Sequence, residues 1–308
     1  MVFFSVSLRH VAKHCQTQKI AARLLSSSSD IARLVEDHDI LFLRPVEEAI
    51  QIVLSNYKST AHILDIEPSE RESLAVARNL DDRLRSFRRN NNCPRCWLQR
   101  AHCICFQCPP LTQETPLFHR IFLLMHHKEV CLTVDTAKLI FLAFPSTSRM
   151  VVAGIGPEYQ TSMEEFLHAT REDHCLVLFP DDDAKTYKSI VAEEPYSTDE
   201  RRKSLIVIDG TWEQARKLYK RYIAPHEGPR PVQLTEEALQ TLTTEEEGGR
   251  QLRRHPQLFR EISTLAALRL FLRDVDPNHE ACTKLTHYQK LADAAARKQL
   301  GEIRYRQC

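Results

Sequence analysis

The sequence predicts an α/β fold with a mostly parallel sheet, and two observations lead to that prediction. Between residues 118 and 210, short apolar runs of strand length recur along the chain. Helix-forming stretches separate these runs, and strands that alternate with helices form parallel sheets whose ligands bind beyond the carboxyl ends of the strands. We therefore look for function in the residues that follow each run.

Composition agrees with a globular protein. The chain has 308 residues, enough for one large domain or two small ones, and its 43% hydrophobic and 27% charged residues are ordinary fractions. A formal net charge of +1 gives no global attraction to nucleic acid, so any basic surface has to be local. No apolar run is long enough to span a bilayer. We expect a monomer with no membrane partner.

The first 29 residues differ in composition from the rest. They are basic, end in a serine run, and contain no acidic residue before Asp30. This pattern is typical of a mitochondrial or plastid transit peptide. The alternative is a disordered or helical tail on a protein of the cytoplasm or nucleus. We expect residues 1–29 to stand apart from the fold.

Residues 30–87 form a predicted helical extension. The stretches "VEEAIQIVLSN" and "SERESLAVARNLDDRLRSFRR" place apolar residues at three- and four-residue spacing. Ser69 and Glu72 have the spacing of a capping box at the start of the second helix. We interpret both helices as packing elements without chemistry of their own.

Five of the ten cysteines gather in one loop, "CPRCWLQRAHCICFQC". A C-x-x-C pair followed by a C-x-C pair can supply four thiolates to one tetrahedral Zn²⁺. Disulfides and reduced core cysteines are the alternatives, but nothing in the sequence suggests secretion. We therefore predict a structural zinc site, with Cys108 and His102 as competing ligands. The four predicted ligands are Cys93, Cys96, Cys103 and Cys105.

The elements of the sheet follow the cysteine loop. The predicted strands are residues 118–127, 150–155, 175–180 and 204–210, with a predicted helix at 135–144. The stretch "WEQARKLYKRY" predicts a helix directly after the last of these strands. Polar clusters end three of the strands, as expected for a site at the carboxyl edge of the sheet.

Two of these clusters have simple structural interpretations. His126 and His127 are as easily surface histidines at a strand end as functional groups. Asp181–Asp183 most simply form the acidic start of a helix, with a magnesium site as the alternative.

The third cluster, Asp209–Trp212, is harder to explain by structure alone. Thr211 with Gln214 has the spacing of a capping box, which accounts for the threonine. A cap needs neither Asp209 nor a large aromatic side chain at Trp212. We therefore regard this turn as the best candidate for a functional site.

Missing motifs narrow the chemistry. The chain has no G-x-G-x-x-G fingerprint and no Walker P-loop, and "GIGP" is too short to replace either. It also lacks the G-x-S-x-G nucleophile elbow.

The ordered motifs resemble one family, the DTW-domain proteins, which are tRNA-uridine aminocarboxypropyltransferases. The motifs are C-x-x-C-x6-C-x-C, "LMHHKEV" with "DTAKL", "LVLFP", "IDGTW" and "LRRHPQLFREISTLAALRL". The resemblance covers residues 88–275 and leaves the carboxyl-terminal helix, 276–308, outside. It implies a SPOUT-like α/β fold that can be knotted, S-adenosylmethionine as donor, and a tRNA uridine as acceptor.

The implied reaction gives the turn residues roles. It moves the 3-amino-3-carboxypropyl group to N3 of the uracil, whose proton has to leave, so a carboxylate beside it can act as general base. Asp209 is the candidate base, and Trp212 can stack on the adenine or the uracil. The residues that we assign to donor binding are Leu178, Phe179, Pro180, Thr211, Trp212, Ser263 and Thr264.

Two segments depart from the family pattern. The family usually has His-Pro-x-Glu where this chain has His126–Glu129, and Ser-Thr-Leu-Glu-Ala where this chain has Ser263–Ala267. Ala266 therefore replaces a glutamate. If that carboxylate anchors the donor in relatives, another acid has to replace it here.

Basic residues after the turn suggest a surface for tRNA. A solvated helix face is the alternative interpretation. The candidate RNA-binding residues are Arg216, Lys217, Lys220, Arg221, Arg253 and Arg254.

Two other functions remain open at this stage. The protein is a non-catalytic zinc-containing RNA-binding module if Ala266 marks a degenerate site. It is a magnesium-dependent nuclease if Asp181–Asp183 and Asp209 hold a metal. Binding of S-adenosylmethionine tests the first alternative, and metal-dependent RNA cleavage tests the second.

Overall fold

The chain divides into two compact units, residues 1–41 and 42–308. The computed structural model describes residues 42–57, 66–112, 118–171, 175–193, 203–241 and 262–301, all in the second unit. The expected transit peptide and the candidate RNA-binding residues Arg253 and Arg254 lie outside the described residues. In the described part of the chain, no helix has the length and apolarity needed to cross a membrane.

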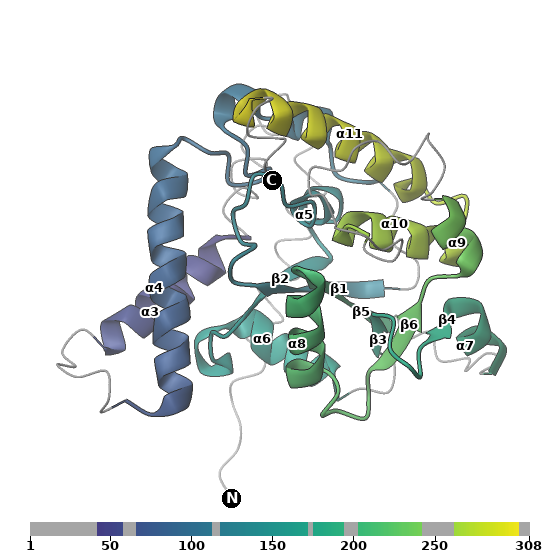
Figure 1. The fold of residues 1–308 in the computed structure, drawn as a ribbon, viewed down its shortest axis with the longest axis horizontal. Coiled ribbons are helices and arrows are strands. Elements are labelled where there is room, and N and C mark those ends of the chain that lie inside the picture. Colours follow the sequence, from purple (N-terminus) through teal and green to yellow (C-terminus); the bar gives the residue numbers. More distant parts are fainter. Residues whose placement is uncertain are drawn as a thin grey trace, which may run out of the picture. The chain divides into compact units, whose positions relative to one another are not determined.

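A six-stranded sheet with every pairing parallel forms the centre of the second unit (Figure 1). The spatial order is β2-β1-β5-β3-β6-β4, so β5 lies between two strands that precede it in the chain. This order places the carboxyl end of β5 in the middle of the sheet edge at which the parallel strands end, where ligands usually bind. We call this edge the site edge. The strands are β1 (Phe118–His126), β2 (Ser148–Ala153), β3 (Cys175–Leu178), β4 (Lys185–Thr186), β5 (Lys203–Asp209) and β6 (Arg230–Gln233).

Helices cover both faces of the sheet, which explains why its central strands are almost wholly apolar. Successive side chains of β1 alternate between two cores: Phe122 and Leu124 enter one, and Ile121 and Leu123 enter the other. The first core is closed by α6 (Thr161–Ala169) and α8 (Trp212–Tyr222). The helices that contribute to the second core are α3 (Arg44–Asn56), α4 (Pro68–Arg89), α5 (Lys138–Ala143), α7 (Tyr187–Glu193), α10 (Thr264–Val275) and α11 (Ala281–Leu300). Of these helices, α5, α10 and α11 lie above the sheet in Figure 1.

Three local predictions differ from the structure. α4 begins at Pro68 with Glu67 as its N-cap, so the predicted capping box at Ser69 is wrong. Proline at the first position starts a helix without needing its missing N–H group. Asp181–Asp183 lie in the loop between β3 and β4, and the next helix, α7 (Tyr187–Glu193), begins four residues after that loop segment, so they are no helix start.

The helix predicted at 135–144 is shorter, because α5 begins only at Lys138. Asp135 instead closes the preceding turn, where its Oδ1 accepts a hydrogen bond of 2.7 Å from the Ala137 N–H. The aspartate is therefore part of the loop at the carboxyl edge of the sheet.

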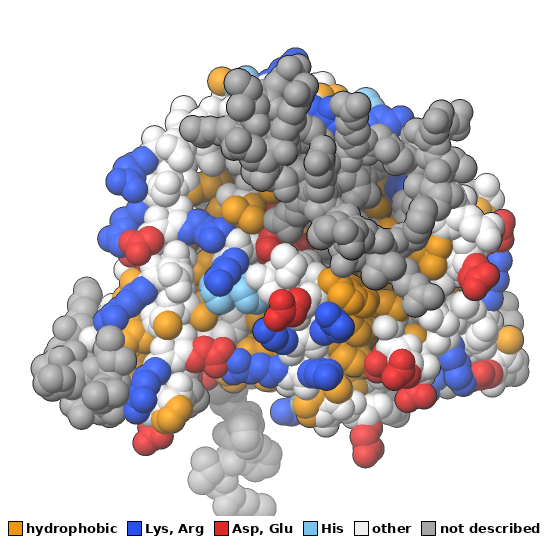
Figure 2. All heavy atoms as spheres, in the orientation of Figure 1, with side chains coloured by type: hydrophobic (Ala, Val, Ile, Leu, Met, Phe, Trp, Pro, Cys, Tyr) orange, Lys and Arg blue, Asp and Glu red, His pale blue; other side chains and the backbone are white. Residues whose placement is uncertain are grey.

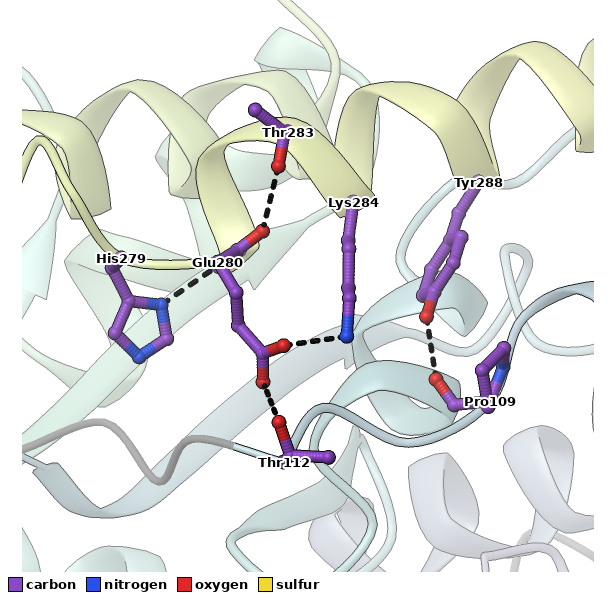
Figure 3. A network of polar contacts seen from close by, with 8 residues as sticks. Pro109, Thr112, His279, Glu280, Thr283, Lys284 and Tyr288 are labelled. Carbon is purple, nitrogen blue, oxygen red and sulfur yellow. Dashed lines mark hydrogen bonds and ion pairs between the residues drawn. The ribbon is translucent and has the colours of Figure 1, made fainter.

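The carboxyl-terminal helix is tied to the segment that leaves the cysteine loop (Figure 3). Glu280 accepts hydrogen bonds from Thr112 at 3.0 Å and from Lys284 at 2.5 Å. One turn further along α11, the Tyr288 hydroxyl donates to the Pro109 carbonyl at 2.5 Å. These contacts join two segments that are far apart in sequence, so α11 belongs to the same folded body as the sheet.

Candidate functional site

The four predicted metal ligands lie together. The Cys93 and Cys105 sulfur atoms are 3.6 Å apart, and those of Cys96 and Cys103 are 3.7 Å apart. All four sulfur atoms lie within 4.8 Å of one another. A tetrahedral Zn²⁺ with Zn–S bonds of about 2.3 Å separates its sulfur ligands by about 3.8 Å, so the spacing fits this ion.

The competing ligands do not join this group. Cys108 is fully buried, and burial raises the pKa of its thiol to about 12. Over the described residues, the four cysteines are the one cluster of three or more His, Cys, Asp or Glu side chains with ligand atoms close enough to share a metal. These are the four cysteines that the sequence predicted as ligands, and their spacing could hold a metal ion.

The local chain explains how the cysteines converge. The Trp97 N–H donates to the Cys93 carbonyl at 2.9 Å, and the Cys93 N–H donates to the Leu98 carbonyl at 2.7 Å, closing a tight turn. Trp97 takes a left-handed conformation with φ 58° and is 1% exposed. An aromatic side chain in this conformation is unusual. Its burial in the same core as α11 anchors the turn.

The turn from β5 to α8 has the predicted cap. Thr211 Oγ1 accepts from the Gln214 N–H, and the Gln214 side chain accepts from the Thr211 N–H at 2.7 Å. A Cβ atom added at Gly210 would lie 3.1 Å from the Cβ of Gln214 and 3.5 Å from the Cβ of His126. Glycine therefore lets the turn pack closely against the end of β1.

Asp209 lies beneath this turn and is only 5% exposed. Its Oδ1 accepts a hydrogen bond of 2.7 Å from the Thr264 hydroxyl, at the start of α10. Ser263 is the N-cap of α10 and accepts from the Ala266 N–H at 3.2 Å. Two motifs that are 55 residues apart in sequence thus meet at one carboxylate.

A second buried carboxyl group, Asp135, interacts with Asp209. Burial is the main cause that raises the pKa of Asp135 well above its usual value, and the charge of Asp209 raises it further. Lys138, which is fully buried, opposes this shift, and its ammonium donates to the Thr133 carbonyl at 2.5 Å. Burial lowers the pKa of Lys138 to about 8. The site edge thus contains a buried cluster of ionisable groups that patterns in the sequence did not reveal.

Aromatic side chains lie on the β3 side of Asp209. The rings of Phe179 and Trp212 stack at 5.5 Å with an angle of 15°, and Phe179 stacks on Tyr219 at 4.4 Å. The Arg216 guanidinium lies 5.9 Å from the centre of the Trp212 ring. The Tyr219 hydroxyl donates to Asp181 at 2.6 Å. These rings form an aromatic surface in which Trp212 is partly exposed and Phe179 and Tyr219 are buried behind it. An exposed aromatic face can accept a base or a cation.

A pocket of about 410 Å³ lies on the other side of Asp209, at the ends of β1 and β2. The rings of His126 and His127 stack in it, with centres 4.4 Å apart. On the face of the molecule that carries α4 and α8, basic side chains, with some acidic ones, gather around a patch of histidine (Figure 2). The residues that line the pocket are Glu72, His126, His127, Lys128, Ala153, Gly154, Thr211, Glu213, Gln214, Lys217, Leu218, Arg221 and Tyr222.

Helix α4 forms one wall of this pocket. Arg83 donates to the Lys128 carbonyl at 2.5 Å, which holds the loop after β1. Glu72 accepts a two-pronged ion pair from Arg221 of α8, with distances of 2.5 and 2.8 Å. A helix that sequence analysis assigned to packing alone therefore contributes to the site edge.

Comparison with family models decides the family. The model described as the DTW domain matches residues 90–295, about two thirds of the chain. The chain belongs to the DTW-domain family. This family is associated with tRNA-modifying enzymes. Comparisons with curated proteins and with solved structures give no match.

The match includes both the cysteine cluster and the turn Asp209–Trp212. It begins before the cysteine cluster and ends within α11, beyond the end of the predicted DTW segment at residue 275. The D-x-T-W motif of the domain is the turn Asp209–Trp212. The resemblance stated from the motifs alone is thereby confirmed.

The structure brings most of the predicted site residues of the DTW domain to one edge. Asp209 contacts Thr264, and Phe179 contacts Trp212. Ser263 and Thr211 act as helix caps. Leu178 is partly buried against the core, and Pro180 is exposed in the loop that follows.

The predicted basic residues of α8 divide between two places. Lys217 and Arg221 line the histidine pocket, whereas Arg216 lies over Trp212. Lys220 is exposed on the same helix.

Sequence analysis missed several charged side chains near the carboxyl edge of the sheet. The buried groups Asp135 and Lys138 lie within the quoted motif "DTAKL", and two charged residues in a stretch that is otherwise apolar could have marked them. Glu72 and Arg83 come from α4, and nothing in the sequence shows which way that helix packs.

Proposed function

We propose that this protein transfers the 3-amino-3-carboxypropyl group of S-adenosylmethionine to N3 of a uridine in tRNA. The observation that carries the proposal is Asp209, a carboxylate of the DTW motif at the centre of the parallel sheet, where the motifs at Thr211–Trp212, Phe179 and Thr264 converge. Membership of a family of tRNA-modifying enzymes supports it.

The reaction needs a donor carbon in line with a nitrogen that is losing its proton. As the N3–carbon bond forms, the carbon–sulfur bond breaks and its electron pair goes to sulfur, releasing methylthioadenosine. The N3 proton passes to a base, and we assign that role to Asp209 because it is the last residue of β5, two residues before the exposed Thr211. The hydrogen bond from Thr264 fixes the orientation of the carboxylate.

The aromatic surface suits the donor. A sulfonium cation is attracted to the faces of aromatic rings, and adenine stacks on them. Trp212, which is partly exposed and stacks on the buried Phe179, offers such a face three residues after Asp209. We assign donor binding to these rings together with the loop at Leu178–Pro180 and the start of α10 at Ser263 and Thr264.

The cysteine cluster has a structural role in this proposal. We assign zinc to Cys93, Cys96, Cys103 and Cys105 because the sulfur spacing fits that ion and leaves no open position for a substrate. The metal would hold the loop against the core that carries α5 and α11.

Nucleoside mass spectrometry tests the proposal. The purified protein, incubated with S-adenosylmethionine and unmodified tRNA, should produce 3-(3-amino-3-carboxypropyl)uridine and methylthioadenosine in equal amounts. Asp209→Asn retains the shape of the side chain but cannot accept the proton, so turnover should fall about 10²- to 10⁴-fold. Wild-type turnover in this variant would reject Asp209 as the base.

One alternative has an observation in its favour. Ala266, which stands where relatives usually have glutamate, is buried and contributes no carboxylate to α10. A non-catalytic RNA-binding module would therefore bind tRNA without binding S-adenosylmethionine, which isothermal titration calorimetry can measure. For the nuclease alternative, Asp181–Asp183 and Asp209 form no cluster with metal-binding spacing in the described ranges.

A further inference from the structure

The histidine pocket has the features of a binding site separate from the aromatic surface. Its volume of about 410 Å³ lies within the range of about 300–1,000 Å³ usual for ligand sites. It also adjoins the DTW turn, since Thr211 lines it and Gly210 packs against His126. A group bound in this pocket would therefore lie close to the carboxyl end of β5, where Asp209 is the last residue.

The two histidines offer a neutral stacking surface. Burial is the main cause that lowers the pKa of both imidazoles, to about 4 for His127, and the positive charges of Lys128 and Arg83 lower both further. His126 Nδ1 accepts from the Lys128 N–H at 3.2 Å, so the neutral ring carries its proton on Nε2. Two stacked, uncharged rings can accept the face of a nucleobase.

Cations surround this stacking surface. Lys128 and Lys217 are exposed at the pocket, and Lys217 forms a surface ion pair with Glu213 at 2.7 Å. Such pairs are weak, so the ammonium group can exchange its partner for a phosphate. Arg221, by contrast, is already paired with Glu72 through two hydrogen bonds. Lys128 and Lys217 are therefore the side chains that we expect to bind a phosphate group of a ligand.

Charge distinguishes this pocket from the donor site. The pocket lining has three cations, Lys128, Lys217 and Arg221, against two glutamates, a net charge of +1 that does not attract the positive sulfonium of S-adenosylmethionine. An aromatic face does attract a sulfonium. RNA is a polyanion with unstacked bases at its loops, and it needs both cations and stacking partners. The order of strands places Asp209 between the pocket, at β1 and β2, and the aromatic surface, at β3.

We propose that the pocket binds a nucleotide of single-stranded RNA beside the target uridine, with its base on the His126–His127 pair and its phosphate at Lys128 and Lys217. This inference rests on the proposed function for its acceptor. Two of the candidate RNA-binding residues of α8, Lys217 and Arg221, line this pocket, and the proposal adds groups from β1, β2 and α4 to them. It also gives a role to His127, which stands where relatives usually have proline.

Equilibrium binding of a fluorescein-labelled, unmodified tRNA transcript at several salt concentrations tests the pocket. Lys128→Ala and Lys217→Ala should each reduce the slope of log affinity against log salt by about 0.7, the value of one lost contact to a single-strand phosphate. His127→Ala should weaken binding about 5- to 150-fold, the loss expected for one stacked base, without changing the slope. The affinity of all three variants for S-adenosylmethionine should stay at the wild-type value.

Matched controls separate the pocket from general effects. Lys188→Ala removes an exposed lysine of α7, outside the pocket lining, and should change neither slope nor affinity. Trp212→Ala should show the reverse pattern, with weaker binding of S-adenosylmethionine. Circular dichroism melts should confirm that each variant folds.

Three outcomes would overturn the pocket proposal. These are wild-type tRNA binding by His127→Ala and both lysine variants, an equal loss in Lys188→Ala, or loss of donor binding in place of tRNA binding. The transferase proposal is tested separately by product formation. tRNA binding that depends on the pocket without any modified uridine would support the pocket and reject the transferase, and the converse result would do the opposite.

Discussion

At the scale of single residues, Asp135 provides a test of the buried carboxyl groups. Its pKa is raised above the usual value, first by burial and then by the charge of Asp209. A carboxyl group with a raised pKa in the folded state stabilises the fold while it is protonated, and this contribution is lost as pH rises through the raised pKa. Asp135→Asn removes the ionisation and should therefore raise the free energy of unfolding at pH 8, by about 1–3 kcal/mol.

Denaturant unfolding at pH 4.5 and pH 8 measures this effect. The advantage of the variant should shrink as pH falls, because the wild-type carboxyl group is then protonated as well. The same two measurements can be made for Asp293, whose pKa is raised to about 6 mainly by burial. A variant that is equally affected at both pH values would show that Asp135 has an ordinary pKa in the folded protein.

The residues that the sequence predicted best were those with local spacing rules. The capping box of Thr211 with Gln214 follows from a three-residue interval, and the cysteine cluster follows from two close pairs. The partner of Asp209 could not be found in this way, because Thr264 is 55 residues distant and only packing of α10 brings it near. The resemblance to a family pointed to both residues but not to their hydrogen bond.

At the scale of elements, the approach of α4 to β2 depends on one glycine. Gly154 follows β2 with φ 91°, and a Cβ atom there would lie 2.8 Å from the Val76 Cγ2 of α4. Gly154→Ala should therefore lower the free energy of unfolding by about 1–2 kcal/mol for the left-handed backbone, with a further loss from the clash. Thermal and denaturant unfolding measure the sum.

A double-mutant cycle separates these two causes. Val76→Ala removes the Cγ2 atom, and the nearest remaining atom of this side chain, Cβ, would be 3.7 Å from the added Cβ. The penalty of Gly154→Ala should thus be smaller in the Val76→Ala background. Equal penalties in both backgrounds would mean that α4 does not pack on this turn.

The strands that were predicted are those with long apolar runs. β1, β2, β3 and β5 are buried on both faces and read as continuous hydrophobic stretches. β4 has two residues and β6 contains Pro231 with only Val232 buried, so neither gives such a signal. Helix α6 was also missed, although Met163, Phe166 and Ala169 lie buried at helical spacing along its nine residues.

At the scale of the whole molecule, the cysteine cluster and the site edge share one core. The cluster packs with α5 and α11, and the charges of Asp135 and Cys96 both oppose the lowering of the pKa of the buried Lys138 of α5 by burial. Gln299 of α11 accepts from the Gln99 N–H at 2.8 Å and also donates to Thr133. Disruption of the cluster should therefore reach the loop that carries Asp135. The SPOUT-like knot and the targeting role of residues 1–29 stay predictions.

Metal removal is the last prediction, and it tests this continuity. The purified protein should contain about one zinc per chain by mass spectrometry, and Cys93→Ser or chelation should remove it. Because binding to four thiolates contributes directly to folding, the melting temperature and the solubility should both fall. Cys282→Ser is the matched control, since its sulfur only donates to the Asp276 carbonyl at 3.7 Å and a hydroxyl can replace that donor. Unchanged unfolding and unchanged donor affinity after complete metal removal would show that the cluster does not support the site.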